Sequence, residues 1–452
     1  MATMRDGHPL ERQFGMELYS TDFDGVGGRL KRRMDDFVVE EITPDGHVLT
    51  VQPWSRNSSE QETLRPIEGD KSRFVTFVLQ KTALSTMDVA AILAAELKIS
   101  RQAVSYAGLK DKRAITVQLM SVPARVADQL RRIRLARIDI RDIRYTRHAV
   151  QIGDLWGNRF TVRLREMAVN CETAAHLMGK VTRRPLLNYF GVQRFGVTRP
   201  YTHLVGKALV RNDFEDAVRL MLTTTSEFES PELTEARRCL AENLEPNEEI
   251  LSMFPPDLRY EQTVMKHLMK RPGDYKRAFS QVPPKVQTIF VHAYQSYLFN
   301  RLISARMRRG ASIMFPEPGD FVIQLDRTHT GRDSWLYVTE RNLEERTRMV
   351  ESGEYGLAAP VPGYATKMPP AWQTDLLHTI LRDEGIELQE FRKPDRPALD
   401  SAGGLHLVSM SPLDLSTECV EGDLVVRFSL RKGSYATVVM RELMKNHPIN
   451  RI

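Results

Sequence analysis

The segment Tyr106-Ala-Gly-Leu-Lys-Asp-Lys-Arg-Ala-Ile-Thr-Val-Gln118 places one carboxylate, Asp111, between two lysines and beside Arg113. Gly108 precedes the charged group, and residues 115–122 alternate as in a β-strand, so we expect Asp111 in the turn before that strand. Nearby cations keep a carboxylate ionised, and an ionised Asp can serve as a nucleophile or base. The same cations can bind phosphate, which points to chemistry on a nucleic acid. Taken alone, the segment is more typical of a charged surface turn, since most runs of charged residues are solvated.

The composition indicates a globular protein. The chain has 452 residues, of which 42% are hydrophobic, enough for two or three domains with a sizeable core. The formal charge of +6 and the pI of about 9.1 are compatible with an anionic partner without identifying one. The first residues lack the apolar segment of a secretory signal, and no apolar run is long enough to span a bilayer. We therefore expect a cytoplasmic protein that makes no membrane contact.

The three cysteines, Cys171, Cys239 and Cys419, are far apart in the sequence. No pair has the spacing of zinc ligands, so no metal site is predicted. The odd number of cysteines and the absence of a disulfide framework are typical of proteins in a reducing compartment.

The pattern along the chain predicts strands near both ends and helices in the middle. Ser85 is predicted as the N-cap of a helix whose apolar face continues to Leu97. A Pro/Gly-rich loop is expected from Ala359 to about Pro370. This order favours one α+β domain interrupted by an insertion. Strands are predicted at 36–40, 74–79, 115–122, 157–164 and 424–430, and helices at 202–268, 286–307 with an aromatic core stripe, and after 433–434.

A basic span follows the Asp111 strand. From residue 131 to 165 the chain alternates apolar and basic residues, which predicts strands with a core face and a cationic face. Its arginines have few acidic neighbours in sequence, so a surface for RNA or phosphate is at least as well supported as a solvated outer face. The arginines are Arg131, Arg132, Arg134, Arg137, Arg141, Arg144 and Arg147.

Five segments together resemble the TruD family of tRNA pseudouridine synthases. The Asp111 segment is similar to the family signature Gly-x-Lys-Asp-x-x-Ala-x-Thr-x-Gln, and Asn158-Arg159-Phe160 is similar to its Asn-x-Phe motif. Asn188-Tyr-Phe-Gly-Val-Gln-Arg-Phe-Gly196 resembles a third block. Lys31 ahead of Asp36-Phe37 fits the N-terminal motif, and Gly433-Ser-Tyr-Ala-Thr437 fits the C-terminal one, with Tyr435 where compact bacterial members carry Phe.

The resemblance implies a fold and a division of the chain. The fold class is α+β, with a pseudouridine-synthase catalytic domain built on a central mixed, largely antiparallel sheet and interrupted by an inserted α/β TRUD domain. We expect the catalytic domain in residues 1–187 and 406–452 and the inserted domain in residues 188–405. Residues 202–285 form a longer span than compact bacterial members need, so the chain looks most like the archaeal branch.

The resemblance also implies an activity. Members isomerise uridine to pseudouridine in tRNA, typically at uridine 13, without a metal, ATP or another cofactor. Asp111 would be the essential carboxylate, which attacks C1′ or takes a 2′ proton on the way to a glycal, and Lys31 would supply a positive charge. Phe37 and Phe160 would pack around the flipped nucleotide.

The resemblance further implies that Asn158 would hold a polar group of the nucleotide and that Tyr435 would stack on the uracil. The expected partner is tRNA, bound by a monomer through its arginines. The candidate contacts to RNA are Arg131, Arg132, Arg134, Arg137 and Arg194.

Other interpretations of these residues stay open at this stage. Phe37 and Phe160 alone would be core residues, Asn158 a turn residue, and Lys31 part of a solvated basic run. The whole chain could be a non-catalytic RNA-binding protein or RNA chaperone on the same scaffold. A nuclease or RNA hydrolase would usually need paired carboxylates with a metal, or a histidine pair, and no such pattern is visible.

Overall fold

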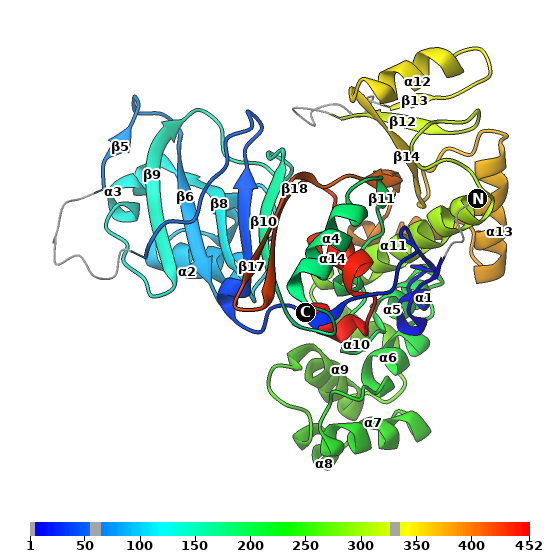
Figure 1. Ribbon diagram of the computed structural model, residues 1–452. Helices are drawn as coiled ribbons and strands as arrows, with labels where there is room; N and C mark the ends of the chain where they lie inside the picture. The colour runs from blue at the N-terminus through cyan, green and yellow to red at the C-terminus, as the bar shows by residue number, and fades with distance from the viewer. Residues whose placement is uncertain (1–4, 55–64, 197, 326–334) are drawn as a thin grey trace.

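The computed structural model describes residues 5–54, 65–196, 198–325 and 335–452. Figure 1 shows a large sheet on one side, a smaller sheet on the other, and helices around the long helix α11 between them. Both sheets and the helices between them make the fold α+β, as predicted from the resemblance.

The large sheet contains ten of the described strands. Nearly all neighbours are antiparallel, and the two parallel pairs are β4 with β8 and β5 with β9. The expected mixed, largely antiparallel sheet is therefore confirmed. The strand order is β17 (Leu413–Val420), β18 (Asp423–Arg431), β10 (Gly157–Met167), β4 (Phe37–Ile42), β8 (Ile115–Pro123), β6 (Phe74–Thr82), β9 (Ile138–Thr146) and β5 (Ile67–Glu68), with β3 (Gly27–Arg29) beside β10 and β7 (Ser105–Tyr106) beside β8.

Helices cover one face of this sheet in two separate cores. Helix α2 (Thr86–Glu96) begins at its predicted N-cap Ser85 and packs on β6, β8 and β9. Helices α4 (Cys171–Val181) and α14 (Ala436–Met444) pack on β4, β10 and β18. The boundary between the cores runs along β4 and β8, where this face carries the buried polar residues Glu41, Thr116 and Gln118.

The middle of the chain is helical, as its sequence pattern predicts. Helix α11 (Pro284–Arg308) buries Phe290, Tyr294 and Leu298, which confirms the aromatic core stripe, although Ile289 on the same helix is 49% exposed. The helices that precede α11 are α5 (Thr202–Val210), α6 (Phe214–Thr223), α7 (Pro231–Asn243), α8 (Glu248–Ser252), α9 (Arg259–Lys270) and α10 (Tyr275–Ser280).

A four-stranded antiparallel sheet packs beside α11. Its order is β13 (Trp335–Tyr337), β12 (Phe321–Gln324), β14 (Tyr355–Val361) and β15 (Gly404–Leu407). The loop predicted from Ala359 was wrong at its start, because Ala359–Val361 pair with β15 and close β14. Helices α12 (Leu343–Glu351) and α13 (Trp372–Glu384) complete this part of the chain.

Short elements join the two parts of the chain. Strand β11 (Leu186–Leu187) pairs with β16 (Ser409–Met410), so the chain leaves the large sheet and returns to it at nearly the same place. The other short strands and α-helices of the described residues are β1 (Arg5–Asp6), β2 (Leu18–Tyr19), α1 (Pro9–Arg12) and α3 (Ala127–Leu130).

A buried ionic cluster joins the two ends of the chain. Glu11 accepts a hydrogen bond from Nε of Arg441 at 2.9 Å and forms a second ion pair with Arg451. Burial alone would raise the pKa of Glu11, but the two guanidinium groups outweigh it and hold this pKa below its usual value. Removal of one partner would leave a buried charge unpaired, so the cluster fixes α1 against α14.

The prediction that the cysteines form no disulfide was wrong. Cys171 at the start of α4 and Cys419 on β17 are bonded, with their Cα atoms 5.9 Å apart. Their sequence separation of 248 conceals this proximity, which arises because α4 packs against the edge strand β17. Among the described cysteines only Cys239 is free.

We expect loss of this disulfide to destabilise the protein without changing its fold. Cys171→Ser should lower the free energy of unfolding by about 2–4 kcal/mol, because the crosslink restricts the unfolded chain. Urea unfolding with and without dithiothreitol measures the effect. The matched control is Cys239→Ser, which should unfold like the unaltered protein and stay sensitive to dithiothreitol. Thiol titration of the unfolded, unreduced protein would contradict the pairing if all three thiols reacted.

Candidate active site

The parallel pairing of β4 and β8 brings Lys31 and Asp111 together. Both residues precede their strands, and parallel neighbours begin at the same edge of a sheet. Nζ of Lys31 lies 3.2 Å from Oδ2 of Asp111. The Lys31 side chain is 7% exposed and that of Asp111 is 45% exposed, so a buried cation supports an accessible carboxylate. Nζ of Lys31 also lies 4.3 Å from the centroid of the Phe37 ring.

Buried polar side chains hold the loop that carries Asp111. The backbone N–H of Lys110 donates to Oγ1 of Thr86 at 2.9 Å, and this hydroxyl donates to Oε1 of Gln118. Nε2 of Gln118 donates to the carbonyl of Gly108 at 3.3 Å. The loop is thus attached to α2 and to β8, which limits the positions that the Asp111 side chain can take.

Two buried lysines lie under the same loop. Nζ of Lys81 donates to the carbonyl oxygens of Asp111 at 2.8 Å and Leu84 at 2.7 Å. Burial lowers the pKa of Lys81 from 10.5 to about 8, and the negative charge of Asp111 opposes that shift. Nζ of Lys110 lies 2.6 Å from Oε2 of Glu41, and both of these side chains are buried.

The sheet supplies two aromatic rings near the ion pair. Phe37 and Phe160 have ring centroids 6.1 Å apart at an angle of 63° and are 1% and 7% exposed. Phe160 on β10 lies opposite Val39 on β4, which in turn lies beside Thr116 on β8. Directly paired residues point to the same face, so Phe160 belongs to the face that carries the polar boundary between the cores.

Two buried oxygens on this face have no hydrogen-bond partner. Oδ1 of Asn158 and Oγ1 of Thr116 are both fully buried and unpaired. Asn158 lies opposite Glu41, whose carboxylate binds Lys110, the neighbour of Asp111. Unpaired buried polar atoms are costly in a folded protein, so each one calls for an explanation such as a bound water or a catalytic role.

Tyr435 belongs to a second group of residues, at the start of α14. Its ring centroid lies 6.3 Å from that of Phe190, and Phe190 stacks on His406 at 4.5 Å. The guanidinium of Arg194 lies 5.7 Å from the Phe190 ring centroid. Burial raises the pKa of Tyr435, whereas burial and the nearby Arg194 lower that of His406 to about 4, so the imidazole is neutral at pH 7. The third sequence block therefore contributes to this group through Phe190 and Arg194.

The basic span differs from its prediction in two ways. Residues 131–137 are not a strand, since β9 begins only at Ile138. The expected lack of acidic neighbours was also wrong, because Arg131 pairs with Asp128, Arg141 with Asp139, and Arg144 with Glu68.

The other four of the seven arginines, Arg132, Arg134, Arg137 and Arg147, lie outside these three pairs. Arg132, Arg134 and Arg137 are exposed, and Arg134 donates to the backbone carbonyls of Arg131 and Ile133. The carbonyl of Arg137 accepts from the N–H of Thr82 at the end of β6. Arg137 therefore lies at the sheet edge that also carries Lys81 and Asp111.

The buried residues that bind the loop carrying Asp111 were not identified from the sequence. Lys81, Glu41 and Thr86 gave no separate signal, because each stands inside a segment that predicts ordinary secondary structure. Only a charged residue in an otherwise apolar strand, as at Lys81, could have indicated them.

Comparisons with known proteins give matches over nearly the whole chain. The family model described as "tRNA pseudouridine synthase D (TruD)" matches residues 13–443. A protein named "Probable tRNA pseudouridine synthase D" from Methanosarcina acetivorans is 33% identical over 453 residues, covering 97% of this chain and 98% of that protein. A protein with the same name from Halobacterium salinarum is 34% identical over 466 residues, covering 99% of this chain and all of that protein. The expected likeness to archaeal members is confirmed.

A solved structure supports the same assignment. A crystal structure described as that of the "Putative tRNA pseudouridine synthase D (TruD)" from Methanosarcina mazei superposes with a TM-score of 0.77 at 31% identity. The match covers 99% of this chain and 100% of that one.

The shifted pKa of Lys81 predicts a pH-dependent stability. The pKa in the folded state is about 8 and the ordinary value is 10.5, so between these values the unfolded chain binds more protons. By linkage the free energy of unfolding then rises with pH. Urea unfolding at several pH values measures this effect. Between pH 7 and 10.5, the free energy of unfolding of the unaltered protein should rise by about 2–3 kcal/mol more than that of Lys81→Met.

The matched control for this experiment is Lys112→Met, since Lys112 is exposed on the same loop. Its stability should follow that of the unaltered protein at every pH. Parallel curves for the unaltered protein and Lys81→Met would show that Lys81 titrates normally.

Proposed function

Because this chain belongs to the tRNA pseudouridine synthase D family, we propose that it isomerises uridine to pseudouridine in tRNA, at uridine 13, with Asp111 as the reacting carboxylate. The enzyme class of the family is isomerase. In this reaction the bond from C1′ to N1 breaks, the uracil turns, and C1′ bonds to C5. C5 then loses its proton and N1 gains one, so there is no net oxidation and the proposed reaction uses no cofactor.

The observation that carries this proposal is the ion pair of Lys31 and Asp111. A carboxylate that attacks C1′ must be ionised and reachable, and the same holds for one that removes a 2′ proton. Asp111 is reachable, since its side chain is 45% exposed, and it forms an ion pair with the buried Lys31. Lys31 acts in this scheme as the fixed positive charge that keeps Asp111 ionised.

The flipped uridine would be held by the residues around this pair. A pyrimidine outside the helix stack needs an aromatic surface and partners for its polar edge. Phe37 and Phe160 would form the apolar floor, and the free Oδ1 of Asn158 would accept a hydrogen bond from the base. Tyr435 would stack on the uracil from the side of α14.

The remaining tRNA would lie across the basic groups. Arg132, Arg134 and Arg137 are exposed, and Arg194 lies beside the Tyr435 group. Arg131 contributes less in this scheme because it pairs with Asp128. Residues 188–405 would form the inserted domain between the catalytic parts 1–187 and 406–452, and the enzyme would act on tRNA as a cytoplasmic monomer. No helix among the described residues is long and apolar enough to cross a membrane.

We expect Asp111→Asn to abolish the reaction while tRNA binding persists. The amide keeps the size of the side chain but can neither attack C1′ nor take a proton. Purified protein is incubated with an unmodified tRNA transcript, and pseudouridine is detected by carbodiimide treatment and primer extension. The control is Asp70→Asn, an exposed carboxylate on the turn before β6.

The same assay separates the competing functions. A stop at uridine 13 that Asp111→Asn lacks and Asp70→Asn keeps supports the proposal, and Lys31→Met should then lower turnover on bound RNA. Tight binding of tRNA by unaltered protein with no new stop would favour a non-catalytic RNA-binding protein. Cleavage of the strand would indicate a nuclease.

The exposed arginines predict a salt-dependent affinity. Each phosphate contact that is lost should reduce the slope of log Kd against log salt by about 0.9 or less. We expect Arg132→Gln combined with Arg137→Gln to reduce the slope by about 1 to 2, measured by filter binding of tRNA transcript at several salt concentrations. Arg144→Gln is the matched control, because Arg144 pairs with Glu68. An unchanged slope in the double variant would exclude these two arginines from the interface.

A further inference from the structure

The four-stranded sheet has two faces with different surroundings. Leu357 and Ala359 on β14 point into the main core, on the side of α11. Residues one position away along the strand point to the opposite face, because side chains alternate. On that outer face the pairing aligns Ile323 with Trp335, and Pro360 with Leu405.

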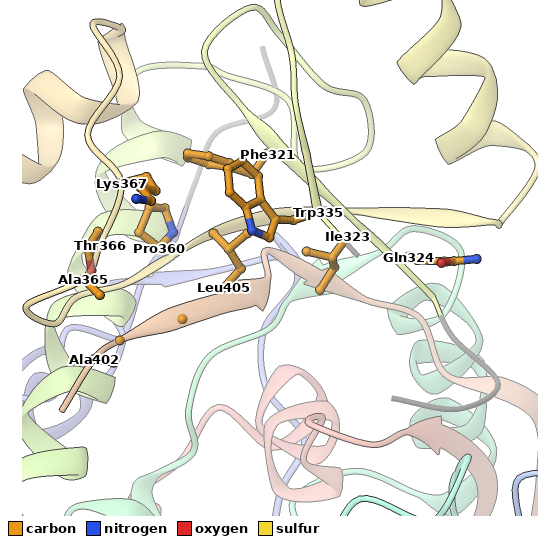
Figure 2. A pocket seen from close by; sticks show the side chains of 12 residues that line it. Phe321, Ile323, Gln324, Trp335, Pro360, Ala365, Thr366, Lys367, Ala402 and Leu405 are labelled. Carbon is orange, nitrogen blue, oxygen red and sulfur yellow. The ribbon is translucent and has the colours of Figure 1, made fainter. Parts of the chain in front are cut away.

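The outer face contains a hollow of about 330 Å³, which we call the outer-face pocket. In Figure 2 Trp335 stands in the middle of this pocket, with Lys367 and Thr366 at one end and Gln324 at the other. The volume is within the range of about 300–1,000 Å³ that is usual for small-ligand sites. The lining residues are Phe321, Ile323, Gln324, Trp335, Pro360, Ala365, Thr366, Lys367, Ala402, Gly403, Gly404 and Leu405.

Trp335 is a supported but accessible ring. Its centroid lies 5.4 Å from that of Phe321, with the two rings at 71°, and Phe321 also touches Tyr337 at 5.4 Å. Phe321 is 3% exposed whereas Trp335 is 37% exposed. The buried ring thus fixes the orientation of the exposed one, which leaves an indole surface available for stacking.

The polar groups of the pocket suit a base attached to a phosphate. Lys367 is exposed and is the one charged residue among the lining residues named above, so the described lining holds a cation and no carboxylate. Oγ1 of Thr366 accepts from the N–H of Gly363 at 2.8 Å, which leaves its own proton free to donate. The amide of Gln324 can both donate and accept.

The rim of the pocket requires glycine. Gly403 has φ +80°, and a Cβ there would lie 2.6 Å from the carbonyl oxygen of Val361 and 2.8 Å from Oγ1 of Thr366. Only glycine adopts this conformation without a clash, so the backbone beside the pocket stays open.

We propose that the outer-face pocket binds an unpaired nucleobase of the RNA substrate, which stacks on Trp335 while Lys367 contacts its phosphate. This inference rests on the proposed function, because it takes RNA to be the substrate. Single-stranded bases are held in this way elsewhere, on sheets that present aromatic rings beside positive charge. A cationic ligand would require carboxylates in the pocket, and a ligand with several negative charges would require further cations. The described lining has neither. The pocket would therefore add a second point of attachment for RNA, separate from the residues around Asp111.

The experiment compares Trp335→Ala with Trp335→Phe on an unmodified tRNA transcript. Loss of one stacked base should raise Kd and KM about tenfold, with kcat unchanged, since no reacting group is touched. Trp335→Phe keeps a ring and should recover most of the affinity. Phe228→Ala is the matched control, because Phe228 is an aromatic residue of the helical region that is 46% exposed. Lys367→Gln should weaken binding and reduce the salt slope by about 0.9 or less.

Ultraviolet crosslinking of the same transcript provides an independent measurement. A crosslinked peptide that contains Trp335, together with the affinity loss, supports the pocket. Unchanged Kd and KM in Trp335→Ala overturn it, and the isomerase function then stands unaffected. If the unaltered protein binds tRNA but does not isomerise it, the proposed function fails and the Kd values still decide about the pocket. A change of oligomeric state in Trp335→Ala, seen by light scattering, would assign the face to a second copy of the chain and overturn the proposal.

Discussion

The parallel contact between β4 and β8 is the constraint on which the candidate site depends. Nearly all neighbouring strands of this sheet are antiparallel, and the parallel pair of β4 and β8 brings the beginnings of two adjacent strands from distant segments to one edge. Lys31 and Asp111 are 80 residues apart in sequence and meet there at 3.2 Å. An antiparallel pairing would have placed them at opposite ends of the sheet. The same strands mark the boundary between the two helical cores, which leaves polar groups on the sheet face beneath the ion pair.

The charges around Asp111 are arranged so that one carboxylate remains accessible. Three lysines surround the loop, and each has a different partner: Lys31 the Asp111 carboxylate, Lys81 two backbone carbonyls, and Lys110 the buried Glu41. Buried charges are stable only when they are paired or hydrogen-bonded. Because Lys81 and Lys110 are satisfied from within the protein, neither of them competes with Lys31 for the Asp111 side chain.

The sequence predicted the elements far better than it predicted their contacts. Local signals located β8, β10, β18, the Ser85 cap and the long helix α11, because periodicity and capping act within a few residues. The motif order located Lys31 and Asp111 but not the buried lysine, Lys81, that holds their loop.

The failures have a common physical origin. Cys171 and Cys419, and likewise Arg144 and Glu68, are brought together by tertiary packing, which no local spacing reports. The prediction of a loop from Ala359 was wrong for the same reason. The end of β14 is a strand because it pairs with β15, which begins only at residue 404. In the local sequence Pro360 predicts the end of a strand, yet it lies within β14 opposite Leu405.

The position of the four-stranded sheet relative to the large sheet follows from how the chain passes between the two sheets. The chain leaves at β11 and returns at β16, and these strands pair with each other. Asn188, directly after β11, is fully buried and donates through Nδ2 to the carbonyl of Leu407 at 3.2 Å. His406 on the same strand stacks on Phe190, the ring beside Tyr435. The strand β15 therefore contacts the Tyr435 group with one face and lines the outer-face pocket through Leu405 with the other. A displacement of this sheet would move both surfaces together, so the fold fixes the distance between them.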